Sequence, residues 1–227
     1  MRINKLFSNY GICSRKAANK LIEENRVIVN GEPCIKGQWV EEEDIILLDN
    51  ERIKPKEKIY IALNKPTGIT CTASNEVKDN IIDFMNYKDY IFPVGRLDKE
   101  SEGLIIMTND GDLANKILES ENEHEKEYVV KLDKPFDEEF IENMSNGVDI
   151  GYKEKTRPCK VKRLSSDTFN IILTQGLNRQ IRKMSGAFGY KVIELKRIRI
   201  MNINLDNLEI GKFRYLTLEE VQKLRES

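Results

Sequence analysis

Residues 92–104 read Phe-Pro-Val-Gly-Arg-Leu-Asp-Lys-Glu-Ser-Glu-Gly-Leu and place a charged turn between two apolar segments. The apolar residues before the turn and the apolar run that starts at Leu104 should hold it between rigid elements. A carboxylate such as Asp98 is then fixed in place yet stays near the surface, where catalytic groups tend to lie. An Arg-x-Asp turn taken alone is more often a surface ion pair. The neighbouring segments therefore decide how this turn is interpreted.

On both sides of the turn, apolar segments of strand length are mixed with helix-like segments. Strands and helices do not alternate regularly, so the pattern is not that of a doubly wound sheet. It predicts an α+β domain over residues 59–227, with a mixed, mainly antiparallel sheet and flanking helices. We expect strands at residues 59–63, 103–108, 127–132, 159–164 and 169–173, and helices at residues 80–86, 112–119, 137–146 and 178–188.

The first part of the chain has a different pattern. A short helix should end at Gly11, and Ser14 is a good N-cap for a second helix. The pair Asn30-Gly31 is favoured in tight hairpin turns. Residues 51–58 contain a proline and alternating charges, as a linker does. We therefore expect a small helical and hairpin domain at residues 1–58.

Composition excludes several classes of function. Hydrophobic residues make up 40% of the 227 residues and charged residues 33%, as in globular proteins. No apolar run approaches the ~18 residues of a spanning helix, and the N-terminus lacks the apolar region of a secretory signal, so we expect a cytoplasmic protein. The four cysteines are widely spaced and His124 is the single histidine, which disfavours a zinc site or a histidine-based triad. Any catalysis should rest on carboxylate, Tyr, Lys or Arg side chains.

Three further motifs accompany the charged turn. Residues 63–68 read Leu-Asn-Lys-Pro-Thr-Gly, residues 124–128 read His-Glu-Lys-Glu-Tyr, and residues 176–184 read Gly-Leu-Asn-Arg-Gln-Ile-Arg-Lys-Met. Taken singly, they are typical of a sharp turn, a strand and a basic helix. In this order and spacing they resemble the pseudouridine synthases of the RsuA type, and within them the RluF-like subgroup that acts on 23S rRNA. The resemblance spans nearly the whole chain, and Lys65 is expected to shape the fold or to touch phosphate.

The N-terminal domain carries a resemblance of its own. Residues 2–5, 11–17 and 26–31 resemble the S-four RNA-binding domain, named for a small-subunit ribosomal protein. This resemblance implies binding to structured RNA and no chemistry. Cations at the start of a helix, beside free backbone amides, suit a phosphate backbone, although a solvated surface would show the same charges. The candidate RNA-binding residues here are Arg2, Lys5, Arg15, Lys16, Lys20 and Arg26.

The synthase resemblance implies three catalytic residues and a reaction. Asp98 matches the nucleophilic aspartate, Arg182 the residue that pairs with it, and Tyr128 the tyrosine that stacks on the target uracil. The implied reaction detaches uracil at N1, turns it and rejoins it through C5 to the same C1′, with no cofactor and no metal. It needs an ionised carboxylate, which a paired cation favours and burial alone would not. Whether Tyr128 also removes a proton stays open, and Arg96 is expected to occupy the place of the extruded nucleotide.

A second basic segment lies near the C-terminus. Between Gly176 and Arg199 the only acid is Glu194, so this segment could hold RNA although the net charge is −1. Solvated surface charges are the open alternative. The expected partners are ribosomal RNA of the 23S type and, as a second candidate, a tRNA, bound by a monomer that touches no membrane. With Arg96, the expected RNA-binding residues of this domain are Arg179, Lys183, Lys196 and Arg197.

Two other classes of function compete with this interpretation. One is a non-catalytic, ribosome-associated RNA-binding protein, but such a module gains nothing from a carboxylate at Asp98 that faces a phosphate backbone. The other is a carboxylate glycosidase, which needs a second acid at a defined separation and an aromatic groove. Aromatic residues at 7% of the chain, with one Trp, offer little for such a groove. The motifs leave the identity of the target uridine open.

Overall fold

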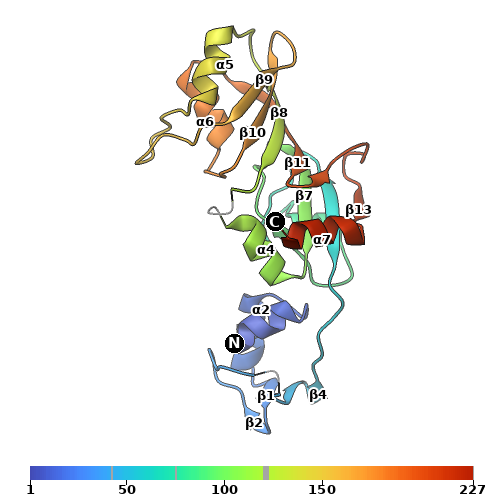
Figure 1. The fold of residues 1–227 in the computed structure, drawn as a ribbon. Helices are drawn as coiled ribbons and strands as arrows, with labels where there is room; N and C mark the ends of the chain where they lie inside the picture. Colours follow the sequence, from blue (N-terminus) through green and yellow to red (C-terminus); the bar gives the residue numbers. More distant parts are fainter. Residues whose placement is uncertain (42, 75, 120–122, 227) are drawn as a thin grey trace.

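The computed structural model describes residues 1–41, 43–74, 76–119 and 123–226. A small N-terminal domain lies at one end of an elongated molecule, and a larger domain built on one long sheet makes up the rest (Figure 1). This arrangement confirms the α+β class. Within the described residues, no helix is long and apolar enough to cross a membrane.

The N-terminal domain packs two short helices against a four-stranded sheet. Its elements are α1 (Ile3–Asn9), α2 (Arg15–Glu23), β1 (Val27–Val29), β2 (Glu32–Pro33), β3 (Ile46–Leu48) and β4 (Glu51–Arg52), in the sheet order β2-β1-β3-β4. The Ser14 hydroxyl accepts a hydrogen bond from the Ala17 amide at 3.1 Å and caps α2 as expected. Asn30 and Gly31 have φ of 51° and 89°, which closes the turn between β1 and β2. Apolar side chains from these elements, including the fully buried Phe7, form a core separate from the larger domain.

The segment expected as a linker begins inside the N-terminal domain. Glu51 and Arg52 form β4 and pair with β3, and Ile53 packs on the N-terminal core. The reason is a turn signal at Asp49 and Asn50, which adopt φ of 52° and 68° and bring the chain back beside β3. The connection between the two domains is therefore shorter than the sequence suggested.

The larger domain is built on a nine-stranded sheet. Its main path runs β13-β5-β7-β11-β8-β10-β9, while β6 pairs with β7 and β12 with β11. The strands are β5 (Tyr60–Lys65), β6 (Phe92–Val94), β7 (Glu102–Thr108), β8 (Lys126–Leu132), β9 (Lys160–Arg163), β10 (Thr168–Leu173), β11 (Val192–Ile200), β12 (Ile203–Asn204) and β13 (Phe213–Tyr215). All recorded pairs between these strands are antiparallel except β7 with β11. A Cβ at Gly103 would lie 2.3 Å from the Arg197 carbonyl oxygen, so this parallel contact requires glycine.

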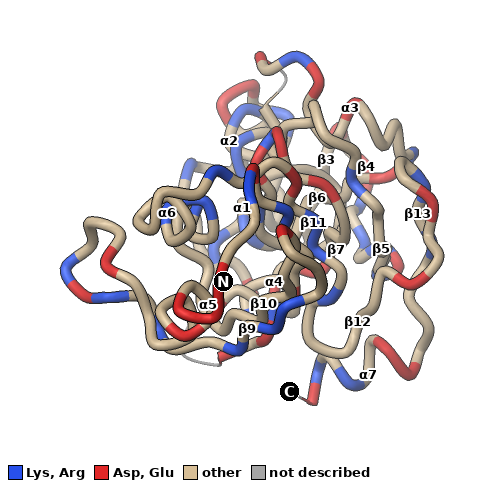
Figure 2. Tube along the Cα trace, turned by 90° about the horizontal axis from the view of Figure 1, so that it is seen from above, with Lys and Arg blue, Asp and Glu red and all other residues tan. Residues whose placement is uncertain are grey.

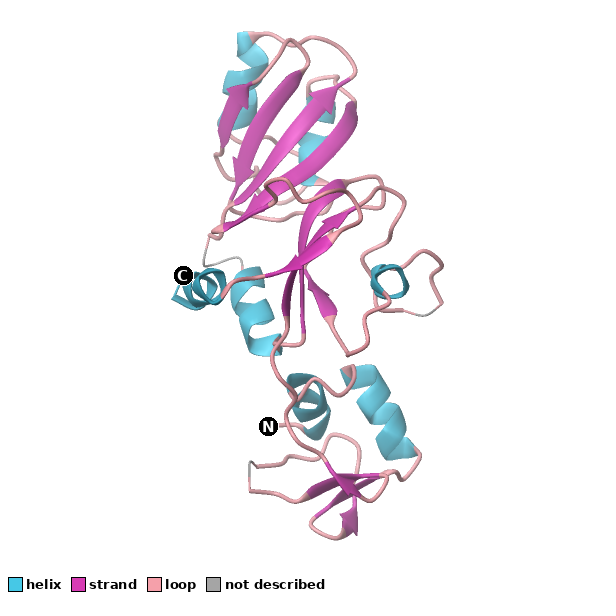
Figure 3. Ribbon diagram, turned by 90° about the vertical axis from the view of Figure 1, so that its right-hand side faces the viewer, coloured by secondary structure: helices cyan, strands magenta, loops and turns pink. Residues whose placement is uncertain are grey.

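Helices cover both faces of the sheet (Figure 3). They are α3 (Ile81–Met85), α4 (Gly111–Leu118), α5 (Glu138–Ser145), α6 (Gln180–Ala187) and α7 (Leu218–Glu226). Successive residues of a strand point to opposite faces. Ile105 on β7 accordingly packs in the core beneath α3, α5 and α6, whereas Ile106 packs with α4 and α7. The strands and helices expected between residues 59 and 188 are found within two residues of their predicted bounds.

Strand β11 is the main element that the sequence analysis missed. It lies at the centre of the sheet, between β7 and β8. Its sequence, Val-Ile-Glu-Leu-Lys-Arg-Ile-Arg-Ile, alternates charged and apolar residues and was interpreted through its charges as an RNA-binding segment. The alternation is also that of a strand, and the sheet accommodates its cations by pairing or burying them.

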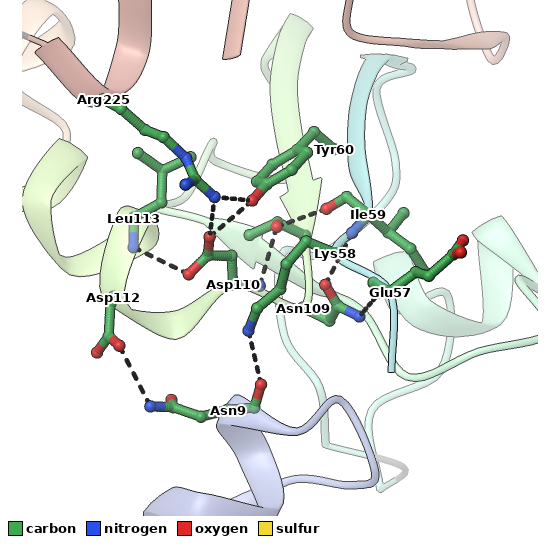
Figure 4. Close-up of polar contacts among 11 residues, drawn as sticks. Asn9, Glu57, Lys58, Ile59, Tyr60, Asn109, Asp110, Asp112, Leu113 and Arg225 are labelled. Carbon is green, nitrogen blue, oxygen red and sulfur yellow. Dashed lines mark hydrogen bonds and ion pairs between the residues drawn. The ribbon is translucent and has the colours of Figure 1, made fainter. Parts of the chain in front are cut away.

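Polar contacts connect the two domains near the start of α4 (Figure 4). Lys58 donates to the Asn9 carbonyl oxygen at 2.6 Å, and the Asn9 amide donates to Asp112 at 3.3 Å. The Asn109 side chain binds the main chain on both sides of Lys58, at Glu57 and Ile59. These bonds fix the connection against the larger domain and so orient the N-terminal domain.

Candidate active site

A cavity of about 450 Å³ opens between the charged turn, α6 and the middle of the large sheet. Its charged and aromatic lining residues are Arg96 and Asp98 from the turn, Glu119 directly after α4, Lys126 and Tyr128 from β8, Arg179 directly before α6, Arg182 from α6, and Arg197 from β11. The structure therefore brings Asp98, Tyr128 and Arg182, which lie far apart in sequence, to one place. The cavity is the candidate active site.

The main chain holds Asp98 firmly. Leu97 is 7% exposed and its amide donates to the Cys71 sulfur at 3.4 Å, so the residue before Asp98 is anchored in the core. The Asp98 carbonyl oxygen accepts from the Ser101 amide at 3.0 Å, and the next carbonyl oxygen accepts from Gly68 at 2.7 Å. Gly68 belongs to the motif at residues 63–68, which thus supports the turn. The Asp98 side chain remains 27% exposed and can meet a ligand.

Arg182 lies beside Asp98. Its Nε is 3.7 Å from Asp98 Oδ2, and this nitrogen is buried with no hydrogen-bond partner among the described residues. The two terminal nitrogens bind the Val192 carbonyl oxygen at 3.1 Å and the Ser101 hydroxyl at 3.2 Å. Burial lowers the pKa of Arg182, and the nearby Arg179 adds to this shift, but a guanidinium stays charged in proteins. The sheet thus holds Arg182 with an unused N–H near the carboxylate.

Arg179 is the second cation beside Asp98. Its Nη1 is 3.9 Å from Asp98 Oδ2 but only 3.0 Å from Glu100 Oε2. The hydrogen bond from Arg179 holds the pKa of Glu100 below its ordinary value. Arg179 has a positive φ of 52° at the start of α6 and is exposed. It therefore lies at the rim, while Arg182 is the inner partner of Asp98.

Tyr128 forms part of the cavity floor together with two cations. It is 9% exposed and packs in the core cluster, so its ring position is fixed. Arg197 lies directly opposite Tyr128 in the ladder between β11 and β8. Lys126, two residues before Tyr128 on the same strand, also lines the cavity. The sequence analysis quoted Lys126 within the motif at residues 124–128 but gave it no role of its own.

The N-terminal candidates for RNA binding fall into two groups. Arg2, Arg15, Lys16, Lys20 and Arg26 are exposed, and Lys5 is half-buried. Three of the six also take part in ion pairs, Lys5 with Asp112, Lys20 with Glu24 and Arg26 with Asp49. Basic and acidic residues are interspersed along the whole trace (Figure 2). Arg15 and Lys16, at the start of α2, are exposed and take part in no recorded ion pair among the described residues.

The candidate RNA-binding residues of the larger domain differ more in their exposure and in their contacts. Arg96 is exposed at the cavity, and Lys183 lies 5.0 Å from the centre of the Tyr152 ring. Lys196 pairs with Glu102 at 3.6 Å. Arg197 departs from the expectation of a surface phosphate ligand, because it is 3% exposed and its Nε donates to the Leu104 carbonyl oxygen at 2.7 Å.

Lys65 is fully buried. Its Nζ donates to the carbonyl oxygens of Pro66 and Ile69 at 2.8 and 2.9 Å. Burial lowers the pKa of this amine. Of the two roles considered for it, shaping the turn at residues 66–69 agrees with this position, whereas contact with a phosphate outside does not.

Comparison with known proteins agrees with this geometry. The model of the RNA pseudouridylate synthase family matches residues 59–187, and that of the S4 domain matches residues 1–46. The chain is 48% identical over 224 residues to the dual-specificity RNA pseudouridine synthase RluF of Escherichia coli, covering 97% of this chain and 77% of the relative. It is 34% identical to the ribosomal large subunit pseudouridine synthase B of Bacillus subtilis, covering 99% and 95%. A crystal structure of a pseudouridylate synthase superimposes with a TM-score of 0.73 at 31% identity, covering 99% of both chains.

Fold and cavity define an RNA-modifying enzyme with a separate RNA-binding domain. The chain belongs to the RNA pseudouridine synthase family. The class of enzyme and the N-terminal domain expected from the sequence motifs are thus confirmed.

Proposed function

We propose that this enzyme isomerises a uridine of large-subunit ribosomal RNA to pseudouridine, with Asp98 as the nucleophile. The observation that carries the proposal is the meeting of Asp98, Arg182 and Tyr128 in one cavity, with Arg182 Nε 3.7 Å from the carboxylate. The likeness to a ribosomal large subunit synthase supports the choice of RNA. The name of the 48% identical relative speaks of dual specificity, which supports testing a tRNA as a second substrate.

The chemistry follows from the charges. An ionised Asp98 can attack or stabilise C1′ as the bond to N1 breaks, as carboxylates do in glycosidases. Arg182 places a fixed positive charge beside the carboxylate and takes no proton, because a guanidinium keeps its charge. The Tyr128 ring offers a stacking surface for the uracil, which must leave the base stack to reach the cavity. Exposed at the rim, Arg96 can fill the place that the extruded nucleotide leaves.

The N-terminal domain would hold the RNA outside the cavity. Its exposed cations, Arg15 and Lys16 above all, can meet phosphates that lie beyond the reach of the turn around Asp98. The enzyme would act as a monomer in the cytoplasm, where ribosomal RNA is made and modified. Neither the detachment of the uracil nor its reattachment requires a cofactor, because the reaction only moves a bond within the nucleotide.

The test is to map pseudouridines with a carbodiimide reaction and primer extension. Purified enzyme would be given transcripts of 23S rRNA, 16S rRNA and tRNA, and RNA from cells with and without the gene would be compared in parallel. We expect a new modification at one site of the 23S transcript and its loss from cells without the gene. Tight RNA binding with no modified uridine in any transcript would instead favour a non-catalytic RNA-binding protein.

A further inference from the structure

Two cations in the cavity floor, the half-buried Lys126 and the buried Arg197, have no recorded acidic partner among the described residues. Arg197 uses Nε on the Leu104 carbonyl oxygen, but its Nη2 is buried without a hydrogen-bond partner in the described parts of the chain. Lys126 donates to the His124 carbonyl oxygen at 3.2 Å, and no ion pair is recorded for it among the described residues. A buried N–H group without an acceptor is costly, so such groups in a cavity indicate a missing ligand.

The charge of the residues that line the cavity indicates the sign of the charge on that ligand. Five cations line it, Arg96, Lys126, Arg179, Arg182 and Arg197, against the acids Asp98 and Glu119. Lys65, which is fully buried, adds a further cation close enough to Arg197 that its pKa is lowered first by burial and also by repulsion from Arg197. A surplus of cations in a partly closed site stabilises a negatively charged group.

The position of the two cations indicates which group that is. Arg197 faces Tyr128 across the ladder and Lys126 lies two residues along the same strand, so all three side chains share one face of the sheet. A uracil stacked on Tyr128 would turn its edge, with two carbonyl oxygens, toward them. Phosphates would remain outside, because Arg197 is 3% exposed.

We propose that Lys126 and Arg197 bind the carbonyl oxygens of the target uracil and stabilise the negative charge it carries once it has separated from the ribose. The inference rests on the proposed function. When the bond between C1′ and N1 breaks, its electron pair stays on the ring and spreads over N1 and the carbonyl oxygens. Lys126 and Arg197 donate hydrogen bonds to this anion and keep their protons. C5 then bonds to C1′ as the Asp98 carboxylate leaves that carbon, the C5 proton passes to water, and N1 takes a proton from water, so atoms and electrons balance.

The protonation state of Lys126 gives the inference a pH signature. Burial, with repulsion from Arg197 added, lowers the pKa of Lys126 to about 8. Among the described residues, the other charged or titratable groups near Lys126 are Lys116, Glu119 and His124 around the end of α4, and Arg96, Asp98, Tyr128, Arg179 and Arg182 in the cavity lining. Stabilisation of an anion needs the ammonium form, which is lost as pH rises above the pKa. A role as proton acceptor would need the neutral amine and would give the opposite slope.

The experiment compares Lys126→Met and Lys126→Arg with the wild type and with Lys131→Met. Lys131 lies on the other face of the same strand and pairs with the exposed Glu194, which makes it a matched control. Single-turnover rates at saturating 23S transcript would be measured from pH 6 to 9.5, with RNA affinity and thermal unfolding measured for each protein. We expect Lys126→Met to slow the single turnover by roughly 10²- to 10³-fold, with RNA affinity within about threefold. Lys126→Arg should recover part of the rate.

The pH profile completes the test. The wild-type rate should fall above about pH 8, and Lys126→Arg should keep its rate there because arginine stays charged. If the wild-type rate instead rises with pH through pH 8, and this rise is absent in Lys126→Met, the inference would be overturned in favour of a proton acceptor. Weaker RNA binding with an unchanged single turnover would also overturn it, in favour of a phosphate contact. An active wild type with an equally active Lys126→Met would refute the inference alone, whereas an inactive wild type would refute the proposed function.

Discussion

The two basic segments of this chain look alike in sequence and differ in structure. At the start of α2, Arg15 and Lys16 are exposed. In the segment from Arg179 to Arg199, Arg182 binds carbonyl and hydroxyl oxygens, Arg197 is buried, and Arg199 pairs with two glutamates. The first group can meet an RNA backbone, and most of the second builds the cavity and the sheet. A count of charges therefore does not distinguish a binding surface from a structural network.

The largest expected effect tests the carboxylate that the second group surrounds. Asp98→Asn keeps the shape of the side chain and removes the ionised nucleophile, so isomerisation should fall by roughly 10⁴-fold or more. RNA affinity should stay within about tenfold, because the cations outside the cavity are untouched. The measurements are pseudouridine formation and RNA binding, with Asp206→Asn, an exposed aspartate, as the control. Appreciable pseudouridine formation by Asp98→Asn would exclude Asp98 as the nucleophile.

The next effect separates the inner from the outer arginine at Asp98. Arg182→Leu removes the buried cation and should slow the single turnover by roughly 10²- to 10³-fold. Arg182→Lys should be milder, since it restores a charge. Arg179→Leu should cost less than Arg182→Leu, because Arg179 is closer to Glu100 than to Asp98. The reverse order in single-turnover rates would make Arg179 the catalytic partner.

A third comparison tests whether Arg199 stabilises the fold and does not bind RNA. Its guanidinium is 2.7 Å from Glu127 and 2.9 Å from Glu125, and its side chain is 20% exposed. Arg199→Met should lower the free energy of unfolding by about 1–3 kcal/mol at pH 7, through loss of charged hydrogen bonds. Chemical denaturation measures this change, and RNA affinity should remain as in the wild type. If Arg199→Met is fully stable but loses much of its RNA affinity, Arg199 binds RNA and does not serve the fold.

The same variant carries a pH dependence. Hydrogen bonds from Arg199 hold the pKa of Glu125 below its ordinary value. Burial opposes the shift at Glu127, but bonds from Arg199 and Asn170 still lower the pKa of that carboxyl. A lowered pKa in the folded state stabilises the fold above the unfolded pKa and loses this contribution as pH falls through the folded one. The difference in stability between wild type and Arg199→Met should therefore shrink below about pH 4.

The smallest expected effect concerns the exposed cations at the start of α2. Replacing Arg15 and Lys16 together by Ala should weaken RNA binding by about tenfold and lower the slope of log affinity against log salt by roughly 1.4–1.8, if each contacts one phosphate. Lys196→Ala should change the slope less, because Lys196 is paired with Glu102. Equal slopes for the wild type and the double variant would remove α2 from the RNA interface.

The sequence predicted most of the local structure and the composition of the site. Ser14, Asn30 and Gly31 could be interpreted because their effects are local, and Asp98, Tyr128 and Arg182 because their motifs resemble a known family. The sequence could not predict that Arg197 is buried, since its burial depends on β11 taking the central place in the sheet. Lys126 acquires its lowered pKa only on folding, chiefly through burial and in part through repulsion from Arg197. Such properties arise from contacts between distant segments, which charge patterns do not reveal.

The parallel contact between β7 and β11 has a consequence for the geometry of the active site. Along the main path of the sheet, β13, β5 and β7 connect to β11, β8, β10 and β9 through this contact, recorded at Glu102 with Lys196 and Gly103 with Arg197. The turn with Asp98 leads into β7, whereas Arg197 lies on β11, so the cavity spans the seam between two halves of one sheet. A small rotation across the seam would change the distance from the nucleophile to the floor. Gly103 lets the two backbones approach closely there, and so sets how near the nucleophile lies to the cavity floor.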